Sequence, residues 1–263
     1  MNRFTKQLTV AISTATLCLG ASAVSAANLL ALSADGQLFK VDTQTLKVSA
    51  NMAASSPSPL RGIDIRPANG KLYALGADNQ LYTVDLASGA ASVAAKLNNS
   101  LPGSGQAVID FNPVADKLRL LAPDGTSFRV NVETGEVVVD GSVAYAADGP
   151  YAGKTAQVLA GAYSNAYAGT TATALYNVDL ASGNLMLQNP PNDGVQQVVG
   201  KIAEGLKAAA LDIQSDGKGG NTAYLLTGKT LHTLDLASGK PTTLGDVAGL
   251  PDNIIDIAVL PAM

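Results

Sequence analysis

Four aspartates are the residues of this sequence whose types and positions could do chemistry together. Each stands between two apolar residues, and the four are Asp64, Asp110, Asp212 and Asp256. We expect them to share one register of the innermost strands of a repeated fold, which would bring all four acids around one axis. Brought close to one another, like charges raise the pKa values of some of the carboxyl groups. Carboxylate oxygens also suit hard cations, which makes these residues candidate ligands for Ca²⁺ or Mg²⁺. The alternative is a structural role, in which each carboxylate accepts hydrogen bonds from backbone amides of a neighbouring segment. We prefer the structural role, and cation binding stays open beside it.

Other reactive side chains are scarce. The one histidine, His232, stands where the related segments of the chain carry Phe or Tyr, which predicts a packing role. The one cysteine, Cys18, lies near the N-terminus, so the remaining sequence offers no thiol nucleophile and no cysteine-based metal site. No Gly-x-Ser-x-Gly motif accompanies His232, and tryptophan is absent. The sequence therefore predicts no catalytic residues and requires no cofactor.

A five-residue pattern of alternating apolar and polar residues recurs five times and predicts the elements that position the aspartates. Its copies end at Asp42, Asp85, Asn131, Asp179 and Asp235, with spacings of 43, 46, 48 and 56 residues. Each repeat contains short apolar or alternating segments bounded by Gly, Pro, Asn and Asp, which is typical of β-strands. Four strands per repeat at this period indicate the blades of a β-propeller.

The two ends of the chain predict how the ring of blades closes. The first repeat begins at Asn28 with a segment that matches a second strand, and the segment 254–259 resembles the first strand of the second repeat, 62–66. A C-terminal strand that joins the first blade removes two exposed sheet edges. We therefore predict an all-β fold, a five-bladed β-propeller whose first blade is completed by the C-terminal strand. The fourth repeat fits least well, and its inner strands cannot be placed from the pattern.

The N-terminus has the features of a secretory signal peptide. Arg3 and Lys6 precede an apolar stretch, and a small-residue cleavage site ends at Ala26. We expect residues 1–26 to be this signal and residues 27–263 to be one propeller domain, located in the periplasm or secreted. No later segment is apolar enough to span a membrane. The net charge of −4, without a basic patch, argues against nucleic acid as a partner. We expect a monomer.

Exposed polar residues at strand ends and in the loops near the fourth repeat are the candidate ligand contacts, because loops on a rigid scaffold usually carry the binding site. The two long loops that flank this repeat are 148–155 and 189–194. The candidate contacts are Arg66, Asn112, Arg119, Asn165, Asn189, Asn192 and Asp193. Each is also a candidate turn or cap residue, since Asn and Asp favour turns.

Several longer motifs occur in a fixed order along the chain. They are 61–67 with 70–73, 109–113 with 115–119, 162–165, and 188–194. In this combination the sequence resembles a bacterial family designated domain of unknown function 4394 (DUF4394), over essentially everything after the signal. The resemblance implies a secreted, propeller-like fold and brings no established activity.

Three functions remain open. The first is an exported, non-catalytic binding or scaffold module that recognises an unknown small molecule or an envelope protein. The second is a hydrolase or lyase that uses the inner-strand carboxylates with a divalent cation. The third is a structural protein of the cell envelope. Fold alone does not choose among them.

Overall fold

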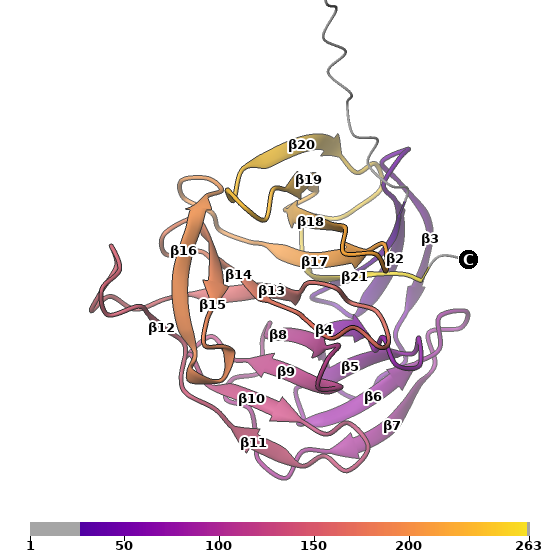
Figure 1. Cartoon of the computed structure of the whole chain (residues 1–263). Coiled ribbons are helices and arrows are strands. Elements are labelled where there is room, and N and C mark those ends of the chain that lie inside the picture. Colours follow the sequence, from indigo (N-terminus) through magenta and orange to yellow (C-terminus); the bar gives the residue numbers. More distant parts are fainter. Residues whose placement is uncertain (1–26, 262–263) are drawn as a thin grey trace, which may run out of the picture.

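The short apolar segments of the repeats form β-strands that end at Gly, Asn and Asp turns. The computed structural model describes residues 27–261, which form five mainly antiparallel sheets arranged around one axis (Figure 1). The predicted signal peptide, residues 1–26, lies outside the described residues. Within residues 27–261, no helix has the length and apolar character that a membrane span requires.

The five sheets follow one another along the chain, and each is described from the axis outward. The first contains β21 (Ile254–Val259), β1 (Asn28–Ser33), β2 (Gln37–Asp42) and β3 (Lys47–Ala53). The second contains β4 (Leu60–Ile65), β5 (Leu72–Gly76), β6 (Gln80–Val84) and β7 (Ala91–Lys96). The third contains β8 (Val108–Asn112), β9 (Lys117–Leu121), β10 (Ser127–Val130) and β11 (Val137–Val139).

The last two sheets complete the ring. The fourth contains β13 (Val158–Tyr163), β14 (Leu175–Asp179), β15 (Asn184–Gln188), β16 (Val195–Lys201) and β12 (Ala144–Tyr145). The fifth contains β17 (Ala210–Ser215), β18 (Asn221–Thr227), β19 (Thr230–Leu234) and β20 (Pro241–Asp246). A single 3₁₀ turn, Pro191–Asp193, joins β15 to β16 within the described chain.

The ring closes through the C-terminal strand, as the sequence predicts. The innermost strands β4, β8, β13, β17 and β21 contact one another in a closed cycle. β21 pairs antiparallel with β1, so the first blade contains strands from both ends of the chain. The prediction of a five-bladed β-propeller is therefore confirmed, and the closure leaves no open end in the array of blades.

Apolar side chains fill the spaces between neighbouring sheets. Leu30 and Leu38 of the first blade pack with Ile63 of the second, and Tyr73 of the second packs with Phe111 of the third. The space between the third and fourth blades differs, because its apolar cluster is built on only three buried residues: Val108, Leu121 and Val158. That interface is completed by a buried ion pair, described below.

The fourth blade departs from the pattern of the others. In four blades the recurring segment forms the third strand from the axis, but in this blade it forms β14, the second strand. The turn aspartate of the copy, Asp179, is consequently fully buried, whereas Asp85 and Asp235 lie exposed in their turns. β12 adds a fifth strand, parallel to β16, at the outer edge. This inward shift explains why the pattern alone does not place the inner strands of the blade.

Candidate functional site

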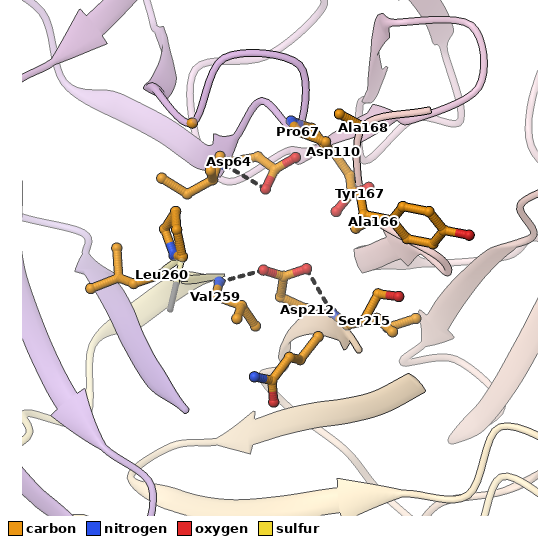
Figure 2. Close-up of a pocket in the computed structure, with 15 residues that line it drawn as sticks. Asp64, Pro67, Asp110, Ala166, Tyr167, Ala168, Asp212, Ser215, Val259 and Leu260 are labelled. Atoms are coloured by element: carbon orange, nitrogen blue, oxygen red, sulfur yellow. Dashed lines mark hydrogen bonds between the residues drawn. The ribbon is translucent and has the colours of Figure 1, made fainter. Parts of the chain in front are cut away.

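Three of the four inner-strand aspartates lie at one level around the propeller axis. Asp64, Asp110 and Asp212 pair with corresponding positions of the second strands, and their carboxylate oxygens lie within 4.8 Å of one another (Figure 2). The other two blades present small residues at this level, Ala162 and Ala258. The amides of the residues that follow them, Tyr163 and Val259, donate to Asp110 and Asp212, which places Ala162 and Ala258 at this level.

Each aspartate accepts a hydrogen bond from a backbone amide of the next blade. The oxygens of Asp64 and Asp110 lie 2.7 Å from the Phe111 nitrogen and 2.9 Å from the Tyr163 nitrogen, respectively. Asp212 accepts in the same way from Val259. These bonds tie neighbouring inner strands together across the ring, and they are the hydrogen bonds that a structural role of the aspartates predicts.

Asp256 belongs to a different level, and the expectation that all four acids share one register is wrong for this residue. Its Oδ2 accepts from the Ile63 amide at 2.8 Å, and a Cβ atom on Gly62 would lie 2.7 Å from that oxygen. Asp256 is therefore level with Gly62, two residues away from the level of Asp64. The C-terminal strand joins its blade without a hairpin loop, and a shift of two residues keeps every side chain on its own face of the sheet.

Burial and mutual repulsion shift the carboxyl groups toward their protonated forms. Burial raises the pKa of Asp64 well above its usual value, and the charge of Asp212 adds to the effect. Burial and the charge of Asp64 do the same to the pKa of Asp110. Burial raises the pKa of Asp212 to about 6, and hydrogen bonds from two backbone amides limit this rise. Burial also raises the pKa of Asp256. The group therefore holds protons at pH values where exposed aspartates have lost them.

The three carboxylates line a cavity of about 310 Å³ at the carboxyl ends of the inner strands, which we call the axial cavity. Figure 2 shows the carboxyl groups of Asp64 and Asp212 turned toward this space. Apolar residues make up much of its lining: Ile65, Pro67, Ile213, Val259, Leu260 and Pro261. The segment 166–168, between β13 and β14, lies at its rim. Gln214 and Ser215 complete the polar lining, and the Oε1 atom of Gln214 is buried without a hydrogen-bond partner among residues 27–261.

The carboxylates have a spacing that can hold a cation. Oxygens within 4.8 Å of one another can reach one ion at the Ca²⁺–oxygen distance of about 2.3–2.6 Å. The proteins that bind Ca²⁺ supply six to eight oxygens, however, and these three residues supply only part of such a set. Asp110 accepts the fewest backbone hydrogen bonds of the three. One of its oxygens accepts from the Tyr163 amide, and the other lies near the carboxylates of Asp64 and Asp212.

Most of the candidate ligand contacts near the carboxyl ends of the inner strands are engaged within the protein. Arg66 forms a bidentate pair with Asp116, at 2.8 and 2.5 Å, and also contacts Glu133. The Oδ1 atom of Asn112 accepts from two amides of its own turn. Asn165 has a positive φ and exchanges hydrogen bonds with Asn221 of the fifth blade. These three residues brace the loops that surround the axial cavity and do not line it.

Arg119 corrects a prediction, because it is buried and not an exposed contact. Its side chain is 1% exposed and pairs with Asp140 at 2.6 Å. It also donates to the Asn192 Oδ1 at 2.9 Å and to the Tyr163 hydroxyl. This network joins the third blade to the fourth and replaces the apolar packing found between the other blades.

The two long loops beside the fourth blade lie at opposite ends of that blade. The 148–155 segment precedes the amino end of β13, whereas the 189–194 loop follows the carboxyl end of β15, which runs parallel to β13. Asn189 and Asp193 are exposed on the second loop and lie outside the lining of the axial cavity. The seven candidate residues therefore do not form one site. The lining residues Gln214 and Ser215 follow Asp212 at the end of an inner strand, a position that sequence spacing can identify, whereas the rim segment 166–168 has no counterpart in the repeats.

The architecture defines the class of protein: a five-bladed β-propeller, closed by its C-terminal strand, with carboxylates at one end of its axis. The sequence profile "Domain of unknown function (DUF4394)" matches residues 37–258, and the chain belongs to this family. No curated protein matches the chain.

Two solved structures share the fold at low sequence identity. One is a protein of unknown function from Bacteroides thetaiotaomicron VPI-5482, which is 13% identical; the match covers 92% of this chain and 68% of that one, with a TM-score of 0.54. A chain of a nidogen/laminin complex is 11% identical over 90% of this chain and 99% of that one, with a TM-score of 0.51. At these identities the likeness concerns the fold alone.

Proposed function

We propose that this protein is an exported, non-catalytic binding module that holds a small cationic ligand in the axial cavity. One observation carries the proposal: three buried carboxylates converge on a cavity of about 310 Å³, at the lower end of the range for small-molecule sites. Pockets with convergent polar groups and shifted pKa values are where ligands usually bind. Export follows from the N-terminal features of the sequence.

The chemistry of the lining favours a cation. The polar residues of the lining include three aspartates, Gln214 and Ser215, whereas the hydroxyl group of Tyr167 points away from the carboxyl groups (Figure 2). The lining residues include no Lys, Arg or His. A buried set of like charges is stable only when it is protonated or neutralised. A positively charged ligand can replace the shared protons and bind the carboxylates through charge-assisted hydrogen bonds or coordination.

The proposal is tested with the chain from residue 27 onward, by calorimetry and thermal unfolding with CaCl₂, MgCl₂ and small ammonium salts. We expect at least one cation to raise the melting temperature by mass action. Asp110→Asn removes a charge and keeps an acceptor for the Tyr163 amide, so it should weaken binding by about tenfold or more. Asp252→Asn removes an exposed charge and serves as the matched control. A panel in which no cation binds, or in which both variants bind like the wild type, would contradict the proposal.

The hydrolase or lyase alternative rests on one further observation. The pKa of Asp212 is raised to about 6, which suits a general acid or base near neutral pH. This alternative expects turnover that depends on Ca²⁺ or Mg²⁺ and disappears in Asp212→Asn. Cation binding without turnover of phosphate, glycoside or uronide substrates favours the binding module.

A further inference from the structure

We propose that three buried amide side chains of the fourth blade form a register lock, which fixes how its strands β14, β15 and β16 pair. The lock consists of Asn177 on β14, Gln188 on β15 and Gln196 on β16. The three residues are 0%, 1% and 1% exposed, respectively, so water cannot satisfy their amide groups. Such a lock acts on the pairing of strands, independently of any ligand in the axial cavity.

The three amides bond to one another across the sheet. The Asn177 Nδ2 atom donates to the Oε1 atoms of Gln188, at 2.9 Å, and Gln196, at 3.0 Å. The Gln196 Nε2 atom donates to the same Gln188 oxygen at 2.8 Å and to the Gly194 carbonyl oxygen at 3.2 Å. The Gln188 Nε2 atom donates to the Pro191 carbonyl oxygen at 2.5 Å. Because Gln188 lies directly opposite Gln196 and diagonal to Asn177, the bonds among the three amides depend on the present register.

The apolar pattern of these strands does not by itself exclude a slip of the pairing. A shift of two residues leaves every side chain on its own face of the sheet. It would, however, move the Asn177 amide by roughly 7 Å along the neighbouring strand, beyond reach of both glutamine oxygens. The buried amides would then lack partners, which is costly in a protein interior. The lock therefore disfavours pairings that hydrophobic burial permits, as a single buried asparagine does in coiled coils.

A glycine of the inner strand supports the same register from the other side. Gly161 of β13 pairs directly with Asn177, and a Cβ atom on this glycine would lie 2.2 Å from the Asn177 Oδ1. That oxygen accepts no hydrogen bond from within residues 27–261, and it packs against the Gly161 backbone. A slip of two residues would place Leu159 or Tyr163 opposite Asn177, where no space exists for a side chain. Sterics on β13 and hydrogen bonds on β15 and β16 thus select the same position of β14.

The other copies of the repeat show why this blade needs such a lock. In the four copies that form third strands, the middle residue of the recurring segment is half-buried: Lys40, Thr83, Arg129 and Thr233. In the fourth blade the segment forms the second strand, and the corresponding residue, Asn177, is fully buried. A buried polar side chain requires partners. Gln188 and Gln196 supply them from the two strands that lie outside β14.

Disulfide trapping measures the register directly, because residues 27–263 contain no cysteine. Leu187 and Gln197 lie opposite each other on β15 and β16, so Leu187→Cys with Gln197→Cys reports the present register. Leu187→Cys with Val195→Cys or with Val199→Cys reports a slip of two residues, since a disulfide requires Cβ atoms about 3.5–4.5 Å apart. Each cysteine pair is introduced into the wild type and into the amide-free variant, which carries Asn177→Leu, Gln188→Met and Gln196→Met. The matched control makes the same changes at half-buried or exposed positions of the first two blades: Asn51→Leu, Gln37→Met and Gln80→Met.

We expect the wild type and the control to form the native cross-link and hardly any slipped one. The amide-free variant should form slipped cross-links about tenfold more often, while its circular dichroism still shows a folded β-protein. Native cross-linking alone in a folded amide-free variant would overturn the proposal, because the amides would then affect stability without setting the register. If that variant does not fold, Gln196→Met takes its place, since it keeps the bond between Asn177 and Gln188. Slipped cross-links in Gln196→Met support the lock, and their absence overturns it.

Discussion

The two ends of the innermost strands carry ionisable side chains of opposite sign in different surroundings. At the carboxyl ends of the inner strands, three buried carboxylates face a cavity. Toward the amino ends lies Arg61 of β4, whose side chain is fully buried. Its guanidinium donates to the carbonyl oxygens of Leu101, Pro102 and Gly105, at 3.0, 2.7 and 2.9 Å. The Arg61 guanidinium donates to three backbone carbonyl oxygens, whereas the carboxylates include an oxygen, on Asp110, that accepts no backbone amide.

A second side chain connects the inner strands near their amino ends. Gln106 precedes β8, and its Nε2 donates to the carbonyl oxygens of Leu159, at 2.9 Å, and Ala209, at 3.0 Å. One amide thus connects the starts of the third, fourth and fifth inner strands. Buried polar groups that find backbone partners serve the fold, and those that face a cavity can also serve a ligand. The amino end is therefore structural, and the carboxyl end is the candidate for binding.

The largest expected effect comes from breaking the ring that holds both ends together. Deletion of residues 253–263 removes β21, exposes the strand edge of β1 and uncovers β4, which contacts β21. We expect loss of cooperative unfolding, or self-association, in size-exclusion chromatography and thermal melts. Deletion of residues 262–263 alone is the control and should behave like the full chain. A monomeric 27–252 chain with an unchanged melting temperature would contradict the role of closure.

The next effect tests the structural end by itself. Arg61→Met removes three hydrogen bonds and leaves buried carbonyl oxygens without partners, which should lower the free energy of unfolding by about 3 kcal/mol or more. Ligand affinity at the opposite end should stay unchanged in the folded protein. Lys207→Met, at an exposed position before β17, is the matched control. Urea denaturation measures the difference, and a loss below about 1 kcal/mol would show that the loop 101–105 adapts without the guanidinium.

Sequence patterns predict the ring well, because closure and blade number follow from spacing. The repeats set five units, and the likeness of segments 254–259 and 62–66 identifies the closing strand. The role of the aspartates also follows from sequence, since a carboxylate in an apolar strand needs amide partners. The level of each aspartate along the propeller axis, however, does not follow from the sequence pattern. Alternation has a period of two, so it allows Asp256 to lie two residues from the level of Asp64 without a change of face.

The fourth blade and Arg119 show a second limit. The segment 175–179 has the same alternation as the other copies, and a hairpin turn such as 179–183 fits between any two adjacent strands of a blade. The pattern therefore predicts that this segment is a strand, but it does not predict which position the strand takes in the sheet. Arg119 is buried by a partner, Asp140, that comes from the linker to the next blade. The local sequence around Arg119 does not predict this ion pair, because the pair depends on how two blades pack against each other.

The third prediction uses pH to distinguish the buried inner carboxyl groups from the exposed aspartates of the turns. The four inner carboxyl groups have folded-state pKa values above the unfolded value of about 3.8, so the folded protein binds more protons than the unfolded chain. Their contribution to stability is full below pH 3.8 and is lost as pH rises through the folded values, including about 6 for Asp212. Each such group lowers the free energy of unfolding by about 1.4 kcal/mol per pH unit within its window.

The measurement is the free energy of unfolding in urea from pH 4 to pH 8. We expect a decline across this range, whereas most proteins gain stability as their carboxylates ionise. Turn aspartates such as Asp42 and Asp85 have pKa values lowered by hydrogen bonds, and their opposite contribution is lost only as pH falls below about 4. A cationic ligand should reduce the decline by neutralising the carboxylates. Stability that rises steadily to pH 8 without any ligand would contradict the raised pKa values.

The smallest effect distinguishes the carboxylates from one another. Both oxygens of Asp64 accept backbone amides, from Ile65 and Phe111, so Asp64→Asn places an N–H₂ group against a donor and should destabilise the fold. Asp110 accepts one amide, from Tyr163, and its second oxygen faces other carboxyl groups. An asparagine at position 110 keeps the amide bond and donates to those oxygens, which should raise stability at pH 8 by on the order of 1 kcal/mol.

This gain should vanish near pH 4, where the carboxyl groups of the wild type are protonated. Thermal melts of both variants at the two pH values provide the test. Equal responses of the two variants would mean that the carboxylates act as one averaged charge. Opposite responses at pH 8 would show that Asp64 is mainly a link between blades, whereas Asp110 carries the free acceptor at the open end. A site can thus be assembled from residues whose first role is structural, provided that one of them retains an oxygen that the backbone does not use.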